Sequence, residues 1–211
     1  MAYNFVRASS QIISFNNGAP SLTNVYPVTF SAWAYGTLDT VAMTIMSWVQ
    51  ASSGQGFRIL FAGQAAGDPV RANVITDTNY ISSISSPGFV INTWHNVCGV
   101  YTSSTSRTIY LDGRQGLTNT TDRTPTSLIR IIIGAYGVDN FDGNISDVAI
   151  WSAALNTDEI NSLAKGFSAK KIRPQSLEFY TPLVRNVYDY SSGSSVTSNT
   201  ATVSTHNRIY S

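Results

Sequence analysis

The segment 94–113 constrains the fold of this chain more strongly than any other part of the sequence. It opens with WHNVCGVY, in which Val97, Gly99 and Tyr101 alternate with a second set of side chains. After a short polar stretch it continues as IYLDG, and the Asp-Gly pair that ends it is a strong signal for a hairpin turn. A period of two residues places the two sets of side chains on opposite faces of a strand. The segment therefore predicts two β-strands and the turn that follows the second.

Alternating segments of the same kind recur along the chain, separated by short runs of turn residues. In 43–50, for example, we expect Met43 and Ser47 to share one face of a strand, with Met46 and Trp48 on the other. Further strands are expected at 11–15, 28–35, 57–62, 70–75 and 179–183, and others near residues 89, 128 and 144. Many short strands with regular turns predict an all-β fold, an antiparallel sandwich of two sheets.

One short helix is predicted at 157–165. Asn156 is a suitable N-cap because its side-chain oxygen can accept free backbone N–H groups of the first turn. Acidic residues follow in that first turn, and a Lys-Gly pair marks the end. Ile160, Leu163 and Ala164 form an apolar stripe, so one side of the helix is apolar.

The composition limits the classes of partner. The 211 residues fit one sandwich domain with a modest extension, and 43% of them are hydrophobic while only 12% are charged. The net charge is +1, and the densest basic patch, 165–173, is the end of the predicted helix and a linker, so we expect no nucleic-acid partner. The first residues lack the features of a signal peptide and no apolar run is long enough to span a membrane, so no membrane association is expected. Cys98 is the single cysteine and is expected in the core.

The carboxylates and histidines do not form a recognisable catalytic set. A glycosidase needs paired carboxylates, but Glu159 lies in the predicted helix and Glu178 begins a late strand. Asp142 and Asp147 are five residues apart, which places them on opposite faces of a regular strand. His95 is expected at the surface or at a strand end, and no serine has the Gly-x-Ser-x-Gly setting of a nucleophile. We therefore expect no enzymatic activity.

Aromatic side chains give two further predictions. Trp94 and Trp151 stand at the ends of strand-like segments, and we expect both to be buried between the two sheets. A sugar-stacking platform would instead need exposed rings on loops, and the candidates for it are Tyr80, Tyr101 and Tyr136.

The composition changes after residue 185. Residues 186–211 are rich in serine and threonine and hold few large apolar side chains, too few to offset the entropy that such a segment loses on ordering. We therefore divide the chain into a sandwich domain, 1–185, and a C-terminal polar arm, 186–211, that becomes ordered on contact with a partner. The residues expected to make that contact are Tyr188, Tyr190, Arg208, Ile209 and Tyr210.

Two ordered patterns, W-H-x-V…G-V-Y…I-Y-L-D-G at 94–113 and I-G-A…F-x-G-x-I-x-D-V-x-I-W at 133–151, resemble the laminin-G-like, concanavalin-A-like jelly-roll family. The resemblance covers about residues 1–183 and implies a two-sheet jelly roll that serves mainly as a scaffold for binding. Some members hold Ca²⁺ at a sheet rim with aspartates and backbone carbonyls, ligands that suit a hard cation. Asp139 and Asp142 would be the ligands here, although Asp and Asn also favour turns without a metal. No other cofactor is implied.

A narrower resemblance links the chain to proteins of tailed bacteriophages. It rests on RASSQ at 7–11, on FYTPLVR at 179–185 and on HNRIY at 206–210 after a serine-rich stretch. It implies a non-enzymatic virion protein assembled in the bacterial host cytoplasm: a capsid decoration (cement) protein or, alternatively, a carbohydrate-binding module of a fibre or adsorption apparatus. The decoration role implies the major capsid protein as a partner and a homo-oligomer, by analogy a trimer. The alternative implies a surface glycan.

Overall fold

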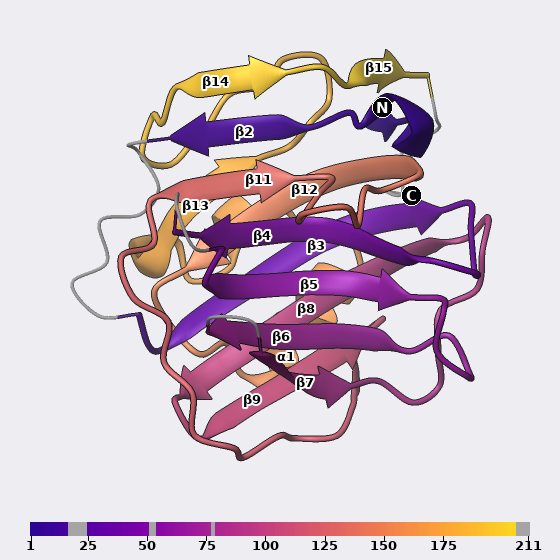
Figure 1. Ribbon diagram of the computed structural model, residues 1–211. Coiled ribbons are helices and arrows are strands. Elements are labelled where there is room, and N and C mark those ends of the chain that lie inside the picture. The colour runs from indigo at the N-terminus through magenta and orange to yellow at the C-terminus, as the bar shows by residue number, and fades with distance from the viewer. Residues whose placement is uncertain (17–24, 51–53, 77–78, 206–211) are drawn as a thin grey trace.

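The alternating segments pair into two antiparallel sheets that stack face to face (Figure 1). The computed structural model describes residues 1–16, 25–50, 54–76 and 79–205. Sheet A contains, in spatial order, β10 (Arg114–Gln115), β9 (Ser106–Leu111), β8 (Trp94–Ser103), β3 (Val28–Gly36), β12 (Gly143–Trp151), β1 (Ala2–Phe5) and β15 (Thr202–Ser204), with β13 (Leu177–Thr181) also paired to β12. Sheet B contains, in order, β14 (Val196–Asn199), β2 (Ile13–Asn16), β11 (Arg130–Ile133), β4 (Ala42–Val49), β5 (Gly56–Ala62), β6 (Val70–Thr76) and β7 (Asn79–Ile84).

The prediction of an all-β sandwich of two antiparallel sheets with one short helix is confirmed. The segment 94–113 forms β8, β9 and the turn after β9, with Gly99 opposite Ile109. Asp112 and Gly113 make the two-residue connection to β10, and their φ angles are 51° and 78°. Positive φ at both central residues is what tight hairpin turns require, and Asp-Gly adopts it readily.

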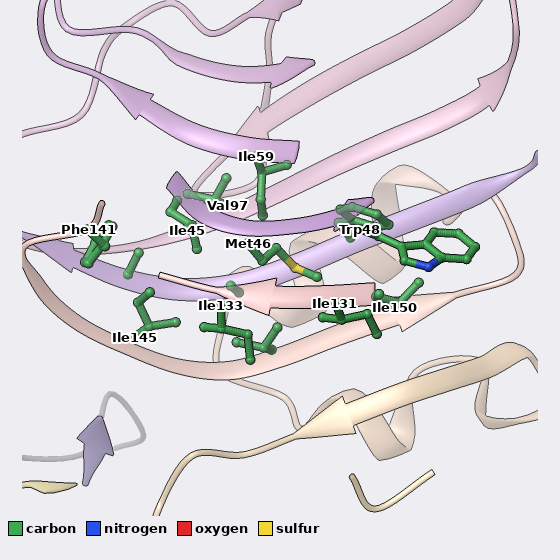
Figure 2. Packing of buried hydrophobic residues seen from close by; sticks show 14 of the residues in the cluster. Ile45, Met46, Trp48, Ile59, Val97, Ile131, Ile133, Phe141, Ile145 and Ile150 are labelled. Atoms are coloured by element: carbon green, nitrogen blue, oxygen red, sulfur yellow. The ribbon is translucent and has the colours of Figure 1, made fainter. Parts of the chain in front are cut away.

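The core lies between the sheets and is filled by apolar side chains from both. Figure 2 shows Ile45 and Trp48 of sheet B packed in the same cluster as Val97, Ile145 and Ile150 of sheet A. Because the inward positions of one sheet meet those of the other, the alternation seen in the sequence is the main determinant of this layer.

The alternation predicted for β4 is wrong in its second half. A bulge between Thr44 and Met46 shifts the pairing of β4 with β5. A bulge puts an extra residue into one strand, so each residue after it points to the opposite face from the one that regular alternation predicts. Ile45 and Met46 therefore both reach the core, Trp48 does as well, and Ser47 points outward.

A second, smaller cluster fills the space between the outer face of sheet A and the segment that holds α1 (Thr157–Ala164) and η2 (Ala169–Lys171). Trp151 is fully buried in this cluster, and its indole Nε1–H donates to the backbone oxygen of Ile172 at 2.8 Å. Cys98 is buried in the same cluster. The prediction of a buried cysteine is confirmed, and the core that holds it is the one beneath the helix.

The prediction that Trp94 and Trp151 lie between the two sheets is wrong. Trp94 is partly exposed on the outer face of sheet A, with its ring centroid 5.8 Å from that of Tyr35. Val97 and Ile150 are the inward-pointing residues of their strands. Trp94 lies three residues before Val97, and Trp151 is next to Ile150. Because side chains of a strand alternate between its faces, both tryptophans point to the outer face of sheet A.

The helix begins at the predicted N-cap. The side-chain oxygen of Asn156 accepts the backbone N–H groups of Asp158 and Glu159, and the Glu159 carboxylate accepts that of Asn156. Arg173 then binds the same carboxylate at 2.8 Å, which ties the helix to the chain that follows it. Two further 3₁₀ turns are η1 (Arg7–Ser9) and η3 (Pro174–Ser176). No helix in the described ranges is long and apolar enough to cross a membrane.

Residues 186–205, here called the C-terminal segment, are folded onto the sandwich. β14 pairs with β2 at the edge of sheet B, and β15 pairs with β1 at the edge of sheet A (Figure 1). The structure thus differs from the prediction of an arm that needs a partner to become ordered. Backbone hydrogen bonds in both sheets stabilise the ordered segment, although it has few apolar side chains to bury.

A buried carboxylate adds to this attachment. Asp189 is fully buried and accepts the backbone N–H groups of Tyr180 at 3.0 Å, Ser191 at 2.9 Å and Ser194 at 3.1 Å. A carboxylate that accepts several N–H groups forms strong, charge-assisted hydrogen bonds. These hydrogen bonds therefore hold the C-terminal segment, together with the packing of Val187, Val196 and Ala201 against the core.

Candidate functional site

The outer face of sheet B carries a row of polar side chains across its central strands. Ser47 of β4 lies opposite Arg58 of β5, Arg58 lies opposite Asn73 of β6, and Asn73 lies opposite Ser82 of β7. Opposite residues of antiparallel strands are close enough for their side chains to touch. The row therefore forms a continuous polar strip on the face that points away from the core.

Arg58 is the centre of this strip. Its guanidinium carbon lies 4.8 Å from the ring centroid of Tyr136 and 5.9 Å from that of Tyr80. Its Nη1 donates to the Asp139 carboxylate at 2.8 Å. Only 6% of Arg58 is exposed, so the two rings and the carboxylate cover most of the cation. Aromatic faces attract a guanidinium through the negative face of the ring, and the attraction grows as water is removed.

The loop between β11 and β12, residues 134–142, brings Tyr136 and Asp139 to this face. The Ser47 hydroxyl donates to the backbone oxygen of Ala135 at 3.2 Å, and the N–H of Thr44 donates to that of Asp139 at 3.1 Å. Both anchoring groups lie on β4 at or next to its bulge. The loop is therefore fixed by backbone oxygens, which leaves its side chains to meet Arg58.

Tyr136 is itself held in place. Its hydroxyl donates to the backbone oxygen of Gly54 at 2.9 Å. Burial raises the pKa of the Tyr136 phenol, an effect that Arg58 partly offsets. The phenol therefore stays protonated at neutral pH and keeps this hydrogen bond. Tyr80 differs, because 53% of it is exposed and its ring remains open to solvent beside Arg58.

Two of the three predicted stacking residues meet at this strip and the third does not. The rings of Tyr80 and Tyr136 both lie close to the Arg58 guanidinium. Tyr101 is fully buried in the core, where its hydroxyl donates to the backbone oxygen of Arg58 at 2.9 Å. Sequence reasoning missed Arg58, although its place among the alternating apolar residues of 57–61 marks an outward cation in an apolar strand.

The predicted metal ligands are in one loop but serve different contacts. Asp139 pairs with Arg58. Asp142 accepts the backbone N–H of Arg7 at 3.1 Å and the hydroxyl of Thr37. Within the described residues no group of three or more His, Cys, Asp or Glu side chains comes together as a metal site would require. Both carboxylates thus bind groups from distant parts of the chain, and the calcium site stays a prediction.

His95 is at a strand start but is not at the surface. It is 7% exposed, its Nδ1 lies 2.7 Å from an Asp112 carboxylate oxygen, and its Nε2 lies 3.1 Å from the backbone oxygen of Val90. Both ring nitrogens therefore have protein partners. Glu159 binds Arg173, and Glu178 accepts the hydroxyl of Ser152 at 2.7 Å, so the two glutamates stabilise separate elements.

The predicted partner-binding tyrosines are exposed on the C-terminal segment. Tyr188 and Tyr190 are 51% and 45% exposed, and their ring centroids lie 5.0 Å apart. The Lys170 ammonium lies 4.5 Å from the ring centroid of Tyr190. The other three predicted contact residues, Arg208, Ile209 and Tyr210, lie outside the described residues.

The sequence and the fold together define a lectin-like jelly roll. Residues 7–161 match the model of the concanavalin A-like lectin/glucanases superfamily, and the chain belongs to that superfamily. No curated protein sequence matches the chain.

Solved structures share the fold at low sequence identity. A candidate carbohydrate-binding protein from Bacteroides ovatus is 18% identical over 96% of this chain, with a TM-score of 0.67, and this chain covers 59% of its length. A heptameric SAP-like pentraxin from Limulus polyphemus is 14% identical over 92% of this chain and 89% of its own, with a TM-score of 0.64. Domain 4 of an extracellular arabinanase from Geobacillus stearothermophilus, solved with arabinotriose, is 14% identical over 65% of this chain and 66% of its own, with a TM-score of 0.54.

Proposed function

We propose that the chain is a non-enzymatic binding module and that the outer face of sheet B binds carbohydrate. The observation that carries the proposal is the row of Tyr136, Arg58 and Tyr80. The C–H groups of a sugar ring stack on an aromatic face, and its hydroxyls need hydrogen-bond partners beside that face. The open ring of Tyr80 offers the aromatic face. The partly exposed side chains of Ser82, Arg71 and Arg130 offer hydrogen-bonding groups around it.

The similar structures support this proposal. One of them is named as a candidate carbohydrate-binding protein and another was solved with an arabinose trisaccharide. The same fold carries binding surfaces in those proteins, but identities below 20% transfer the fold and not the ligand. The argument for this chain therefore rests on its own face of sheet B.

A saccharide screen with the purified chain tests the proposal. We expect binding to at least one class of oligosaccharide, and we expect Tyr80→Ala to weaken it about tenfold or more, since the loss of one stacking ring removes on the order of 1–2 kcal/mol. Phe167→Ala is the matched control, because it removes a ring that is 54% exposed and follows α1, away from sheet B. Binding that survives Tyr80→Ala, or no binding to any saccharide, would refute the proposed site.

The capsid-decoration role stays a prediction from the sequence resemblance, as do the major capsid protein as partner, a homo-oligomer and location in the virion. The contacts of the described residues do not bear on it. Quantitative mass spectrometry of particles that contain the chain distinguishes the two roles. A decoration protein should be present in hundreds of copies, and a binding module of a fibre or adsorption apparatus in a few tens or fewer.

A further inference from the structure

The outer face of sheet B holds two more arginines, one on either side of the polar strip. Arg71 of β6 lies opposite Leu60 and Ile84, and Arg130 of β11 lies opposite Val49. Val70 and Ala72 on either side of Arg71, and Ile131 next to Arg130, point into the core. Both arginine side chains are therefore on the outer face of sheet B. With Arg58, three cations from three strands share this face.

Arg71 and Arg130 differ from Arg58 in their pairing. Arg58 binds Asp139, whereas neither Arg71 nor Arg130 has a carboxylate within ion-pair distance among the residues that the structure describes. Both side chains are only partly buried. Their guanidinium groups can therefore accept an anion from outside the chain without first breaking an ion pair.

Asn73 supplies an independent observation at the same place. It is fully buried between Arg58 and Ser82, and its side-chain oxygen accepts the Ser82 hydroxyl at 2.7 Å. Its side-chain nitrogen has no hydrogen-bond partner. An unpaired buried donor costs free energy, so a face that keeps one gains when a ligand supplies an acceptor.

These groups give the face many donors and few acceptors. Arg71, Arg130 and the amide nitrogen of Asn73 all donate, and the carboxylate of Asp139 is already engaged by Arg58. Neutral sugars offer hydroxyls that both donate and accept, so they gain no special advantage from such a face. A carboxylate or sulfate group only accepts, and guanidinium groups bind it through paired, charge-assisted hydrogen bonds.

We infer that the ligand of this face is an acidic saccharide, one that carries carboxylate or sulfate groups. The inference rests on the proposed carbohydrate-binding function and names its ligand class. The exposed ring of Tyr80 stacks on one sugar, while Arg71 and Arg130 bind acidic groups that other sugars of the same oligosaccharide carry as it crosses from β7 to β11. A nucleic acid is disfavoured, because the whole chain has a net charge of only +1.

Isothermal titration with hexagalacturonate and its full methyl ester tests the inference, because the two probes share a backbone, differ in charge and are long enough to reach from Arg71 to Arg130. We expect the acid to bind about tenfold or more tightly than the ester, and added salt to weaken the binding of the acid alone. A second pair, dextran sulfate and dextran, tells whether a sulfate or a carboxylate is the preferred group. Preference for either charged member supports the inference.

Arg71→Gln and Arg130→Gln should each weaken binding of the acid about tenfold, and thermal melting checks that each variant is folded. Arg114→Gln is the matched control, because it removes the same charge from an exposed position in β10 of sheet A. An equal loss with Arg114→Gln would show general attraction of polyanions and overturn the inference. Tighter binding of a single-stranded oligonucleotide would overturn it as well.

The failures of the two proposals are distinguishable. Equal binding of acid and ester that depends on Tyr80 but not on Arg71 leaves the carbohydrate site in place and overturns the acidic ligand. Absence of binding to every probe, charged or neutral, overturns both.

Discussion

The buried carboxylate of Asp189 attaches the C-terminal segment to the sandwich, and the substitution Asp189→Ala tests that role. The carboxylate accepts the backbone N–H groups of Tyr180, Ser191 and Ser194 and the hydroxyl of Ser192. The hydrogen bonds from Tyr180 and Ser194 are buried, and each buried donor left without a partner costs about 1–3 kcal/mol. Alanine should therefore cost about 2–6 kcal/mol at this site, which is a large part of the stability of a typical domain.

Urea denaturation followed by tryptophan fluorescence measures the loss, and hydrogen exchange locates it. If the segment detaches before the sandwich unfolds, amide exchange should become faster in β14 and β15 while β3 and β5 keep their protection. Asp39→Ala, at an exposed position in the connection between β3 and β4, is the control and should behave as the wild type. An Asp189→Ala protein with the wild-type denaturation midpoint and unchanged exchange in β14 and β15 would refute the attachment argued here.

Two further predictions concern the cluster beneath the helix. Trp151→Ala should lower the free energy of unfolding by about 3–5 kcal/mol, because it removes a fully buried side chain. Trp94→Ala, at a partly exposed position, should lower it clearly less. Urea denaturation of the two variants side by side measures both losses, and equal losses would contradict the prediction. Burial raises the pKa of the Cys98 thiol, so a thiol-specific reagent should label the native protein no faster than it unfolds. Rapid labelling under native conditions would show that Cys98 is accessible.

Local alternation is enough to predict most strands of this fold. In β8 the alternation of Val97, Gly99 and Tyr101 with a second set of side chains follows from the sequence, as does the Asp112–Gly113 turn, but the sequence does not tell which set faces the core. Such signals depend on neighbours within a few residues, so no knowledge of the rest of the fold is needed. The same holds for the N-cap of α1, which is a contact between residues three apart.

Predictions that depended on distant parts of the chain were less successful. The sequence predicts that Trp151 is buried but places it in the wrong layer. The side chain is covered by α1 and η2 on the outer face of sheet A, and the sequence does not show where these elements pack. The order of residues 186–205 comes from pairing with β1 and β2, almost two hundred residues earlier, and a polar sequence gives no sign of such pairing. The loop that holds Asp139 and Asp142 is predicted correctly from its turn residues. The ion pair between Asp139 and Arg58 could not be predicted, because it depends on how the strands pair.

The bulge in β4 connects the packing of the core with the proposed binding face. In a regular strand Ile45 and Ser47 would point inward and Met46 outward. The bulge lets Ile45 and Met46 both enter the core, which buries one more large apolar side chain, and Ser47 is thereby turned to the outer face. There its hydroxyl holds the loop that carries Tyr136 over Arg58. The bulge in β4, which the sequence pattern does not predict, is therefore one of the features that position the residues of the site.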